Sequence, residues 1–205
     1  MGWTLLFHPD LLLKSPLNHN IDSFTYFSYE VNEALHLSDK EANVVLQVIE
    51  QIKTEYAQNI DQHSQNLIVS NLELLLSYCM RFYDRQFYTR TNMNSDFVSQ
   101  FERLLKAYFA SGLHLTHGIP SLSYFGAEMN MSAHYLSDLL KKETGKGIKE
   151  YVDDYIVRSA KGMLLGSNDS ISQIAYDLGF EYPQSFSRLF KKKVGQSPGD
   201  YRKLN

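Results

Sequence analysis

Side chains suited to reading nucleic acid are concentrated near the C-terminal end of the chain. An amide such as that of Gln184 and a guanidinium such as that of Arg188 can pair with base edges, whereas a lysine such as Lys192 attracts phosphates. Residues 183–205 hold six basic side chains and one acidic side chain, a local net charge of +5, although the whole chain carries −3. This pattern predicts a surface that binds phosphates. The polar face after Pro183 consists of Gln184, Ser185, Ser187, Arg188, Lys191 and Lys192.

A second and less basic face occurs about fifty residues earlier. Asp138 stands at the position that answers Arg188, and phosphates repel a carboxylate. We consider three roles for Asp138: it accepts a hydrogen bond from a cytosine amino group, it discriminates against wrong sites, or it pairs with a neighbouring lysine. The side chains of this face are Ala133, His134, Ser137, Asp138 and Lys141.

The two faces belong to an internal repeat, which is the most informative feature of the sequence. Residues Leu136, Leu139, Leu140, Lys141, Lys142, Gly145 and Tyr151 are answered fifty positions later by Phe186, Leu189, Phe190, Lys191, Lys192, Gly195 and Tyr201. Upstream, Ser121 and Leu122 answer Ser170 and Ile171 at an offset of forty-nine. The second copy therefore has one extra residue between its helices.

The second copy has the pattern of a helix-turn-helix unit. Ser170 and Gln173 predict a capping box, and Gly179 supplies the positive φ that the turn needs. Pro183 fits the first turn of the following helix, where its missing N–H is not required. The side chains predicted to face the core are Ile171, Ile174, Ala175, Leu178, Phe186, Leu189 and Phe190.

The first copy uses different residues for the same turn. Asn130 tolerates the left-handed conformation, and Gly126 allows a close approach of the two helices. A linker helix from about residue 148 to 165 is predicted to join the copies. Two such units can place their recognition helices in successive turns of the DNA major groove, roughly 34 Å apart.

Four segments of the sequence resemble the AraC/XylS family of bacterial transcription regulators. They are residues 135–145 (YLSDLLKKETG), 174–182 (IAYDLGFEY), 185–191 and 195–202 (GQSPGDYR). The resemblance covers about residues 95–205. It implies an all-helical domain whose recognition helices, about residues 132–142 and 183–192, enter adjacent major grooves. By motif position it implies DNA contacts by Ala133, His134, Ser137, Asp138, Pro183, Gln184, Ser187 and Arg188.

The N-terminal half is predicted to hold a short β segment followed by two helices. Aromatic and small residues alternate from Phe24 to Tyr29, which is typical of strands. Ser38 and Glu41 form a capping box that predicts a helix to about Tyr56. Apolar residues at every third or fourth position predict a longer helix from about residue 62 to 87. Its stripe contains Leu67, Ile68, Leu72, Leu75, Cys79 and Phe82.

The apolar stripe of the longer helix has two possible partners. It closes on the preceding helix, or it pairs with a second copy of the chain to form a homodimer. The candidate dimer residues are Leu72, Leu75, Cys79 and Phe82, while Ile68 is not assigned to the contact. The family resemblance implies that this half is the end of a cupin-like regulatory domain with its dimerising helices. Because most of the barrel is missing, a truncated or shortened regulator is expected and no small-molecule effector is assigned.

Composition and charge favour a globular protein of the bacterial cytoplasm. Hydrophobic residues make up 43% and charged residues 21% of the chain, which is ordinary soluble usage. The single cysteine, Cys79, cannot form an internal disulfide. No signal peptide and no apolar run near the ~20 residues of a membrane helix are found. Residues 1–94 hold six basic and eleven acidic side chains (−5), and residues 95–205 hold fourteen and twelve (+2), so the domain boundary is placed near residues 91–96.

Catalysis, metal binding and cofactor binding are not predicted. Asp153 and Asp154 are adjacent, so on a helix they point about 100° apart, and we assign them to the solvated surface. His114 and His117 lie in the polar stretch 111–120 without further metal ligands, and this stretch is interpreted as a solvated loop. No nucleophile or phosphate-binding glycine loop was found.

The sequence therefore predicts a mainly α protein of two parts. Residues 1–94 are a short β remnant and a helical dimerisation segment, and residues 95–205 are two helix-turn-helix units joined by a linker helix. The predicted function is sequence-specific binding of double-stranded DNA and regulation of transcription, with RNA polymerase as a candidate further partner. The alternative is a dimerising interaction protein or antagonist of a full-length relative, whose DNA binding would be indifferent to sequence.

Overall fold

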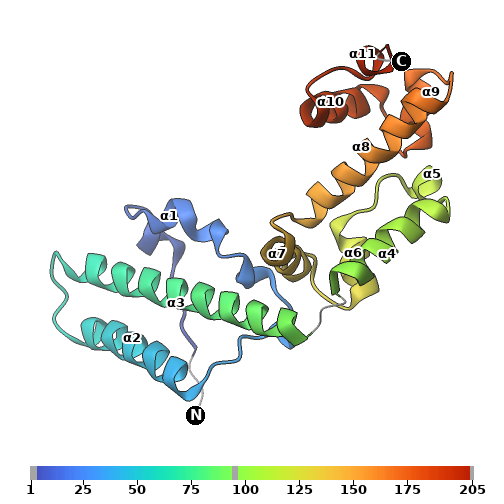
Figure 1. The fold of residues 1–205 in the computed structure, drawn as a ribbon. Coiled ribbons are helices and arrows are strands. Elements are labelled where there is room, and N and C mark those ends of the chain that lie inside the picture. Colours follow the sequence, from blue (N-terminus) through green and yellow to red (C-terminus); the bar gives the residue numbers. More distant parts are fainter. Residues whose placement is uncertain (1–3, 94–96, 204–205) are drawn as a thin grey trace. The chain divides into compact units, whose positions relative to one another are not determined.

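The computed structural model describes residues 4–93 and 97–203. The chain divides into two compact units, residues 1–92 and 93–205. All regular elements within the described residues are helices, as Figure 1 shows, so the predicted mainly α class is confirmed and the predicted β remnant is wrong. In the same ranges, none of the helices combines the length and the apolar character needed to cross a lipid bilayer.

The aromatic segment that was predicted to form strands folds into short helical turns. Strands need neighbouring strands to satisfy their backbone groups, whereas these aromatic rings pack on a helix. The Tyr26 ring stacks on Tyr83 at 5.3 Å between centroids, and its hydroxyl donates to the Leu76 carbonyl at 3.0 Å. The turns are η1 (Pro9–Leu12), α1 (Leu17–Asn20), η2 (Ile21–Ser23), η3 (Thr25–Ser28) and η4 (Val31–Glu33).

Two long helices follow these turns in the first unit. Helix α2 (Asp39–Ala57) begins with the predicted capping box: Ser38 Oγ accepts from the Glu41 amide at 3.4 Å, and Glu41 Oε2 accepts from the Ser38 amide at 2.8 Å. Helix α3 (Ser64–Met93) extends beyond its predicted end at residue 87. Before it, Asp61 Oδ1 accepts from the amides of His63 and Ser64, which lowers the pKa of the carboxyl.

The apolar stripe of α3 is covered within its own unit. Leu72 belongs to a core cluster with Leu12, Leu17, Val69 and Leu76. The exposed fractions of Leu72, Leu75 and Phe82 are 2%, 7% and 6%, and Cys79 is half-buried, which raises the pKa of its thiol. The four candidate dimer residues therefore have most of their surface covered by neighbours in the same chain.

The second unit is built around one long central helix, α8 (Ile148–Gly166), which matches the predicted linker. Helices α7, α9, α10 and α11 pack against α8 (Figure 1), and the end of α10 lies beside its first two turns, where Lys193 binds Glu150 and Asp154. Large side chains such as Phe101, Tyr135 and Phe186 are fully buried in this unit. The other helices are α4 (Phe97–Ala110), α5 (Leu113–His117), α6 (Leu122–Met129), α7 (Ala133–Thr144), α9 (Ile171–Asp177), α10 (Pro183–Val194) and α11 (Pro198–Arg202).

Residues 111–120 are not the solvated loop that the sequence suggested. They contain helix α5, which is bracketed by Gly112 and Gly118, both with positive φ. The His114 ring packs on Phe109 at 4.9 Å between centroids, and its Nε2 lies 3.1 Å from the carbonyl oxygen of Asp177 at the end of α9. This long-range contact gives the segment a partner that local sequence cannot reveal.

Gly179 lies where α5 meets the turn after α9. Its φ is +87°, as the sequence predicted for a turn residue. In addition, a Cβ atom at this position would lie 2.9 Å from the carbonyl oxygen of His114 and 3.3 Å from its Cβ. A glycine is therefore required both for the turn and for the close approach of α5.

The two requirements can be separated by a pair of alanine substitutions. Gly195 also has positive φ, at +88°, but a Cβ there would meet nothing within 4 Å. We expect Gly195→Ala to lower the free energy of unfolding by about 1–2 kcal/mol, the cost of a left-handed alanine. Gly179→Ala should cost a further ~1–3 kcal/mol because the added methyl group collides with α5.

The measurement is urea unfolding of the 205-residue chain followed by circular dichroism, with both variants compared with the unmodified chain. An equal decrease in the free energy of unfolding for the two variants would show that α5 does not pack closely against the turn at Gly179.

Candidate nucleic-acid interface

The first helix-turn-helix unit consists of α6 and α7. Ser121 caps α6 by accepting from the Tyr124 amide at 3.1 Å, and Ser132 caps α7 by accepting from the Tyr135 amide at 3.2 Å. Between the helices, Asn130 adopts the predicted left-handed conformation, with φ 53° and ψ 44°. A Cβ at Gly126 would lie 2.6 Å from the Met131 carbonyl oxygen. The predicted close approach at Gly126 is therefore confirmed.

The second unit consists of α9 and α10, and only half of its predicted capping box forms. Ser170 Oγ accepts from the Gln173 amide at 3.0 Å, but the Gln173 side chain donates to Asp177 Oδ1 at 2.8 Å instead of reaching back. In a complete box Gln173 Oε1 would accept from the Ser170 amide. Here the side chain turns to Asp177, whose charged carboxylate accepts a strong hydrogen bond from Nε2. Pro183 occupies the first turn of α10, as predicted.

Helix α10 carries most of the predicted site residues on its exposed side. Phe186 and Phe190 are fully buried and Leu189 is half-buried, so the opposite side of the helix faces solvent. Of the candidates on α10, Gln184, Ser185, Arg188 and Lys192 are exposed, and Pro183 and Ser187 are half-buried. Lys191 is exposed as well.

The predicted site residues on α7 are less exposed to solvent than those on α10. Tyr135, Leu136, Leu139 and Leu140 are buried. His134 and Lys141 are exposed, whereas Ala133, Ser137 and Asp138 are half-buried. Ser137 lies against the start of α8, since a Cβ at Gly147 would come within 3.0 Å of its Oγ. The first recognition helix thus offers a smaller exposed polar face than the second.

Two of the six basic side chains counted in residues 183–205 are engaged within the protein. Arg202 donates from Nη2 to the Asp169 carbonyl at 2.6 Å. Lys193 Nζ lies 2.8 Å from Asp154 Oδ1 and 3.4 Å from Glu150 Oε1 on α8. The outward basic surface of α10 therefore rests on Arg188, Lys191 and Lys192.

Asp154 is a residue whose role the sequence interpretation missed. Its two carboxylate oxygens bind different lysines: Oδ2 lies 2.7 Å from Lys146 Nζ, and Oδ1 binds Lys193. Burial alone would raise the pKa of Asp154, but the hydrogen bonds from both lysines lower it below its ordinary value. The pKa values of Lys146 and Lys193 are raised by the hydrogen bond to Asp154. The neighbouring Asp153 behaves oppositely, since its burial raises its pKa.

One part of this arrangement could be found in the sequence. Glu150 and Asp154 are four residues apart and therefore share a face of α8. Two negative charges at this spacing repel each other, so a nearby positive side chain is expected to stabilise them. The partner Lys193 is 39 residues away along the chain, and no local pattern identifies it. No cluster of three or more potential metal-ligating side chains occurs among the described residues, and His114 and His117 do not form one.

Comparison with known proteins identifies the domain. A family model described as a helix-turn-helix domain matches residues 125–204. The chain is 25% identical over 138 residues to the Msm operon regulatory protein of Streptococcus mutans, covering 67% of this chain and 47% of that protein. It is 35% identical over 82 residues to the uncharacterized HTH-type transcriptional regulator YtdP of Bacillus subtilis, covering 40% and 11% of the two chains.

A third relative is the HTH-type transcriptional activator RhaR of Yersinia pseudotuberculosis, 39% identical over 67 residues, or 33% of this chain and 23% of that protein. The chain thus spans less than half the length of each of these relatives. The family match, residues 125–204, begins within α6 and includes α7, α8, α9 and α10. Residues 125–204 thus match a helix-turn-helix domain, and this match supports the resemblance of the domain to the AraC/XylS type.

Proposed function

We propose that this protein binds specific sites in double-stranded DNA and regulates transcription from them. The observation that carries the proposal is the pair of capped helix-turn-helix units packed on one helix, α8, with an exposed polar face on each second helix. In this motif the second helix enters the major groove. Two units in one compact domain suit a site with two subsites in successive major-groove turns.

The two recognition helices are proposed to contribute unequally. Helix α10 carries exposed Gln184 and Arg188, which can pair with adenine and guanine edges, and exposed Lys191 and Lys192, which attract phosphates. Helix α7 offers His134 and Lys141 together with half-buried Asp138. We infer that α10 supplies most of the affinity and that α7 adjusts the preference.

Selection of bound sequences from a random DNA pool tests the proposal directly. We expect enrichment of a site that spans two successive turns of the helix. Gel-shift titration with random-sequence competitor tests the alternative of an interaction protein or antagonist without its own target. Binding that is sensitive to salt but indifferent to sequence would support that alternative.

Substitutions on α10 should separate base contacts from phosphate contacts. On the selected site, Arg188→Ala and Gln184→Ala should each weaken binding by about 1–3 kcal/mol and relax the preference at a few base pairs. Lys192→Ala should weaken binding to all sequences alike and reduce the salt dependence by about one phosphate contact. The measurement is fluorescence anisotropy at several salt concentrations.

The matched control for Arg188→Ala is Arg158→Ala, because Arg158 is also exposed but lies on α8 rather than on α10. Unchanged base preference in both Arg188→Ala and Gln184→Ala would contradict base recognition by α10.

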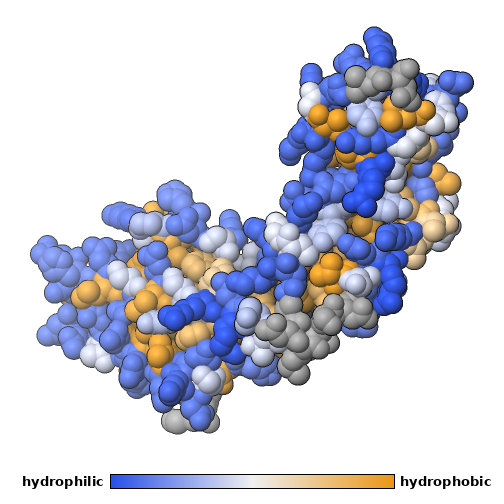
Figure 2. Space-filling model, in the orientation of Figure 1, coloured by the Kyte–Doolittle hydropathy of each residue, from blue (hydrophilic) through white to orange (hydrophobic). Residues whose placement is uncertain are grey.

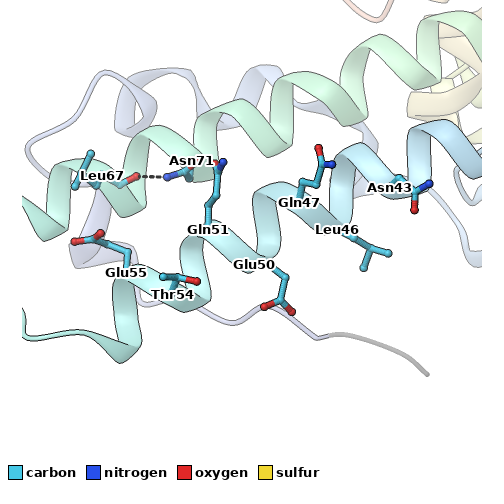
Figure 3. Close-up of a pocket in the computed structure, with 9 residues that line it drawn as sticks. All are labelled: Asn43, Leu46, Gln47, Glu50, Gln51, Thr54, Glu55, Leu67 and Asn71. Atoms are coloured by element: carbon cyan, nitrogen blue, oxygen red, sulfur yellow. Dashed lines mark hydrogen bonds between the residues drawn. The ribbon is translucent and has the colours of Figure 1, made fainter.

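We further propose that the protein forms a homodimer through exposed residues of α2 and α3. A groove of about 760 Å³ runs between these helices, lined along successive turns of α2 and by Leu67 and Asn71 of α3 (Figure 3). Leu46 and Leu67 on its wall are 42% and 48% exposed. Leu74 is 42% exposed and one heptad after Leu67, which is the repeat of a coiled-coil seam.

This interface differs from the one predicted from the apolar stripe of α3. Leu72, Leu75 and Phe82 are already covered within the chain, so changing them would disturb the fold of the first unit. Apolar side chains are visible among hydrophilic ones on the face shown in Figure 2. A second copy that covers Leu46, Leu67 and Leu74 would remove such surface from water.

Sedimentation equilibrium tests the dimer. The unmodified chain should sediment as a dimer, and Leu67→Glu with Leu74→Glu should sediment as a monomer because two buried charges would face each other across the seam. Leu115→Glu, which changes a 63% exposed leucine of the second unit, is the control and should remain dimeric. A monomeric unmodified chain would rule out this interface.

A further inference from the structure

Four charged side chains join both helix-turn-helix units to α8. Asp154 and Glu150 lie on α8, Lys193 lies in the last turn of α10, and Lys146 follows the end of α7. The ion pairs are Lys146–Asp154 at 2.7 Å, Lys193–Asp154 at 2.8 Å and Lys193–Glu150 at 3.4 Å. The two positive and two negative charges balance, so the cluster adds no net charge to the DNA-binding domain.

The connection to α7 is itself constrained. Thr144, the last residue of α7, donates from Oγ1 to the Leu140 carbonyl at 2.8 Å and accepts at Oγ1 from the Lys146 amide at 3.2 Å. Gly145 ends the helix in the left-handed conformation with φ 76°. The backbone of Lys146 is therefore held at a defined position relative to α7. The ion pair of its side chain with Asp154 consequently links the end of α7 to α8.

The connection to α10 is equally short. Lys193 is the penultimate residue of α10, and its side chain is only 22% exposed. Because Asp154 binds Lys146 with one carboxylate oxygen and Lys193 with the other, the chain of contacts from α7 to α10 passes through a single carboxylate.

We propose that Asp154 is a positioning residue that sets the offset between the two recognition helices, α7 and α10, and so selects DNA sites by the spacing of their two subsites. The proposal rests on the DNA-binding function proposed above. Individual ion pairs near the surface contribute little to stability. The bridge therefore acts on geometry, by restricting how far α7 and α10 turn about α8.

This role differs from that of a DNA-contacting residue. Asp154 and Asp153 each place one negative charge on the same turn of α8, so neutralising either should change the general attraction to phosphates to a similar degree. Only Asp154 forms the bridge. Asp153→Asn is therefore a charge-matched control for Asp154→Asn.

The test uses the full chain and the site selected with the unmodified protein. Affinity is measured on that site and on versions with one base pair inserted or removed between the subsites, which rotates and shifts one groove relative to the other. We expect the unmodified protein and Asp153→Asn to lose about tenfold or more in affinity on the altered spacings. Asp154→Asn should lose less than about threefold, because its recognition helices adjust more freely.

A second variant disrupts the bridge from its other end. Lys146→Gln removes the α7 contact but leaves Lys193 bound to Asp154, and it should also reduce the spacing penalty. Its charge-matched control is Lys149→Gln, which changes an exposed lysine on the same helix as Asp154. Circular dichroism during heating should show that all four variants remain folded at the assay temperature.

The outcomes distinguish the two proposals. If no sequence is enriched from the random pool, the proposed function fails before spacing is considered. If a site is enriched but Asp154→Asn and Lys146→Gln keep the same spacing penalty as their controls, DNA recognition stands and the positioning role of Asp154 is overturned. A smaller penalty in both variants, with their controls unchanged, supports it.

Discussion

The apolar stripe of α8 is the surface on which both helix-turn-helix units are assembled. Ile148, Val152, Ile156, Ala160 and Leu164 recur every four residues, and each is at most 3% exposed. Helices α7, α9, α10 and α11 all pack against α8. Burial of each large apolar side chain contributes roughly 1.5–3 kcal/mol. Because the stripe is continuous, neither unit can leave α8 without exposing apolar surface, and this packing brings Lys146 and Lys193 within reach of Asp154.

The two units of the repeat have their closest backbone contacts at different positions. In the first unit the close approach is at Gly126, and the turn residue Asn130 is exposed. In the second unit the position that answers Gly126 is Ala175, which is fully buried, and the tight contact moves to Gly179 against α5. The repeat therefore preserves the fold of each unit without preserving each contact, since the turn of the second unit packs against His114 of α5.

Folding also reduces the number of basic side chains that are available to bind phosphates. The net charge of +5 in residues 183–205 counts Lys193 and Arg202 as available to a phosphate. In the structure Lys193 neutralises carboxylates of α8, and Arg202 holds the backbone carbonyl of Asp169 ahead of α9. The basic surface is therefore narrower and is centred on α10, which is consistent with the unequal roles proposed for the two recognition helices.

Local sequence was sufficient for features that depend on a few neighbouring residues. It determined the capping serines, the left-handed turn residues Asn130 and Gly179, the start of α10 at Pro183 and the approximate bounds of the linker helix α8, because backbone sterics and helical periodicity act over one or two turns. It also identified the polar face of α10, including Gln184 and Arg188. It failed for the aromatic segment near Tyr26, since alternation of side chains does not reveal whether a partner strand or a helix is available.

Only the tertiary structure decided which distant groups meet. The docking of His114 on α9, the covering of Leu72 by Leu12 and Leu17, and the bridge from Lys146 through Asp154 to Lys193 join residues that are far apart in sequence or on different helices. Such contacts depend on how whole helices pack, and side-chain type and spacing within one helix do not contain that information. The exposed polar face of α10 could thus be predicted from the sequence, whereas its position relative to α7 was decided by packing on α8.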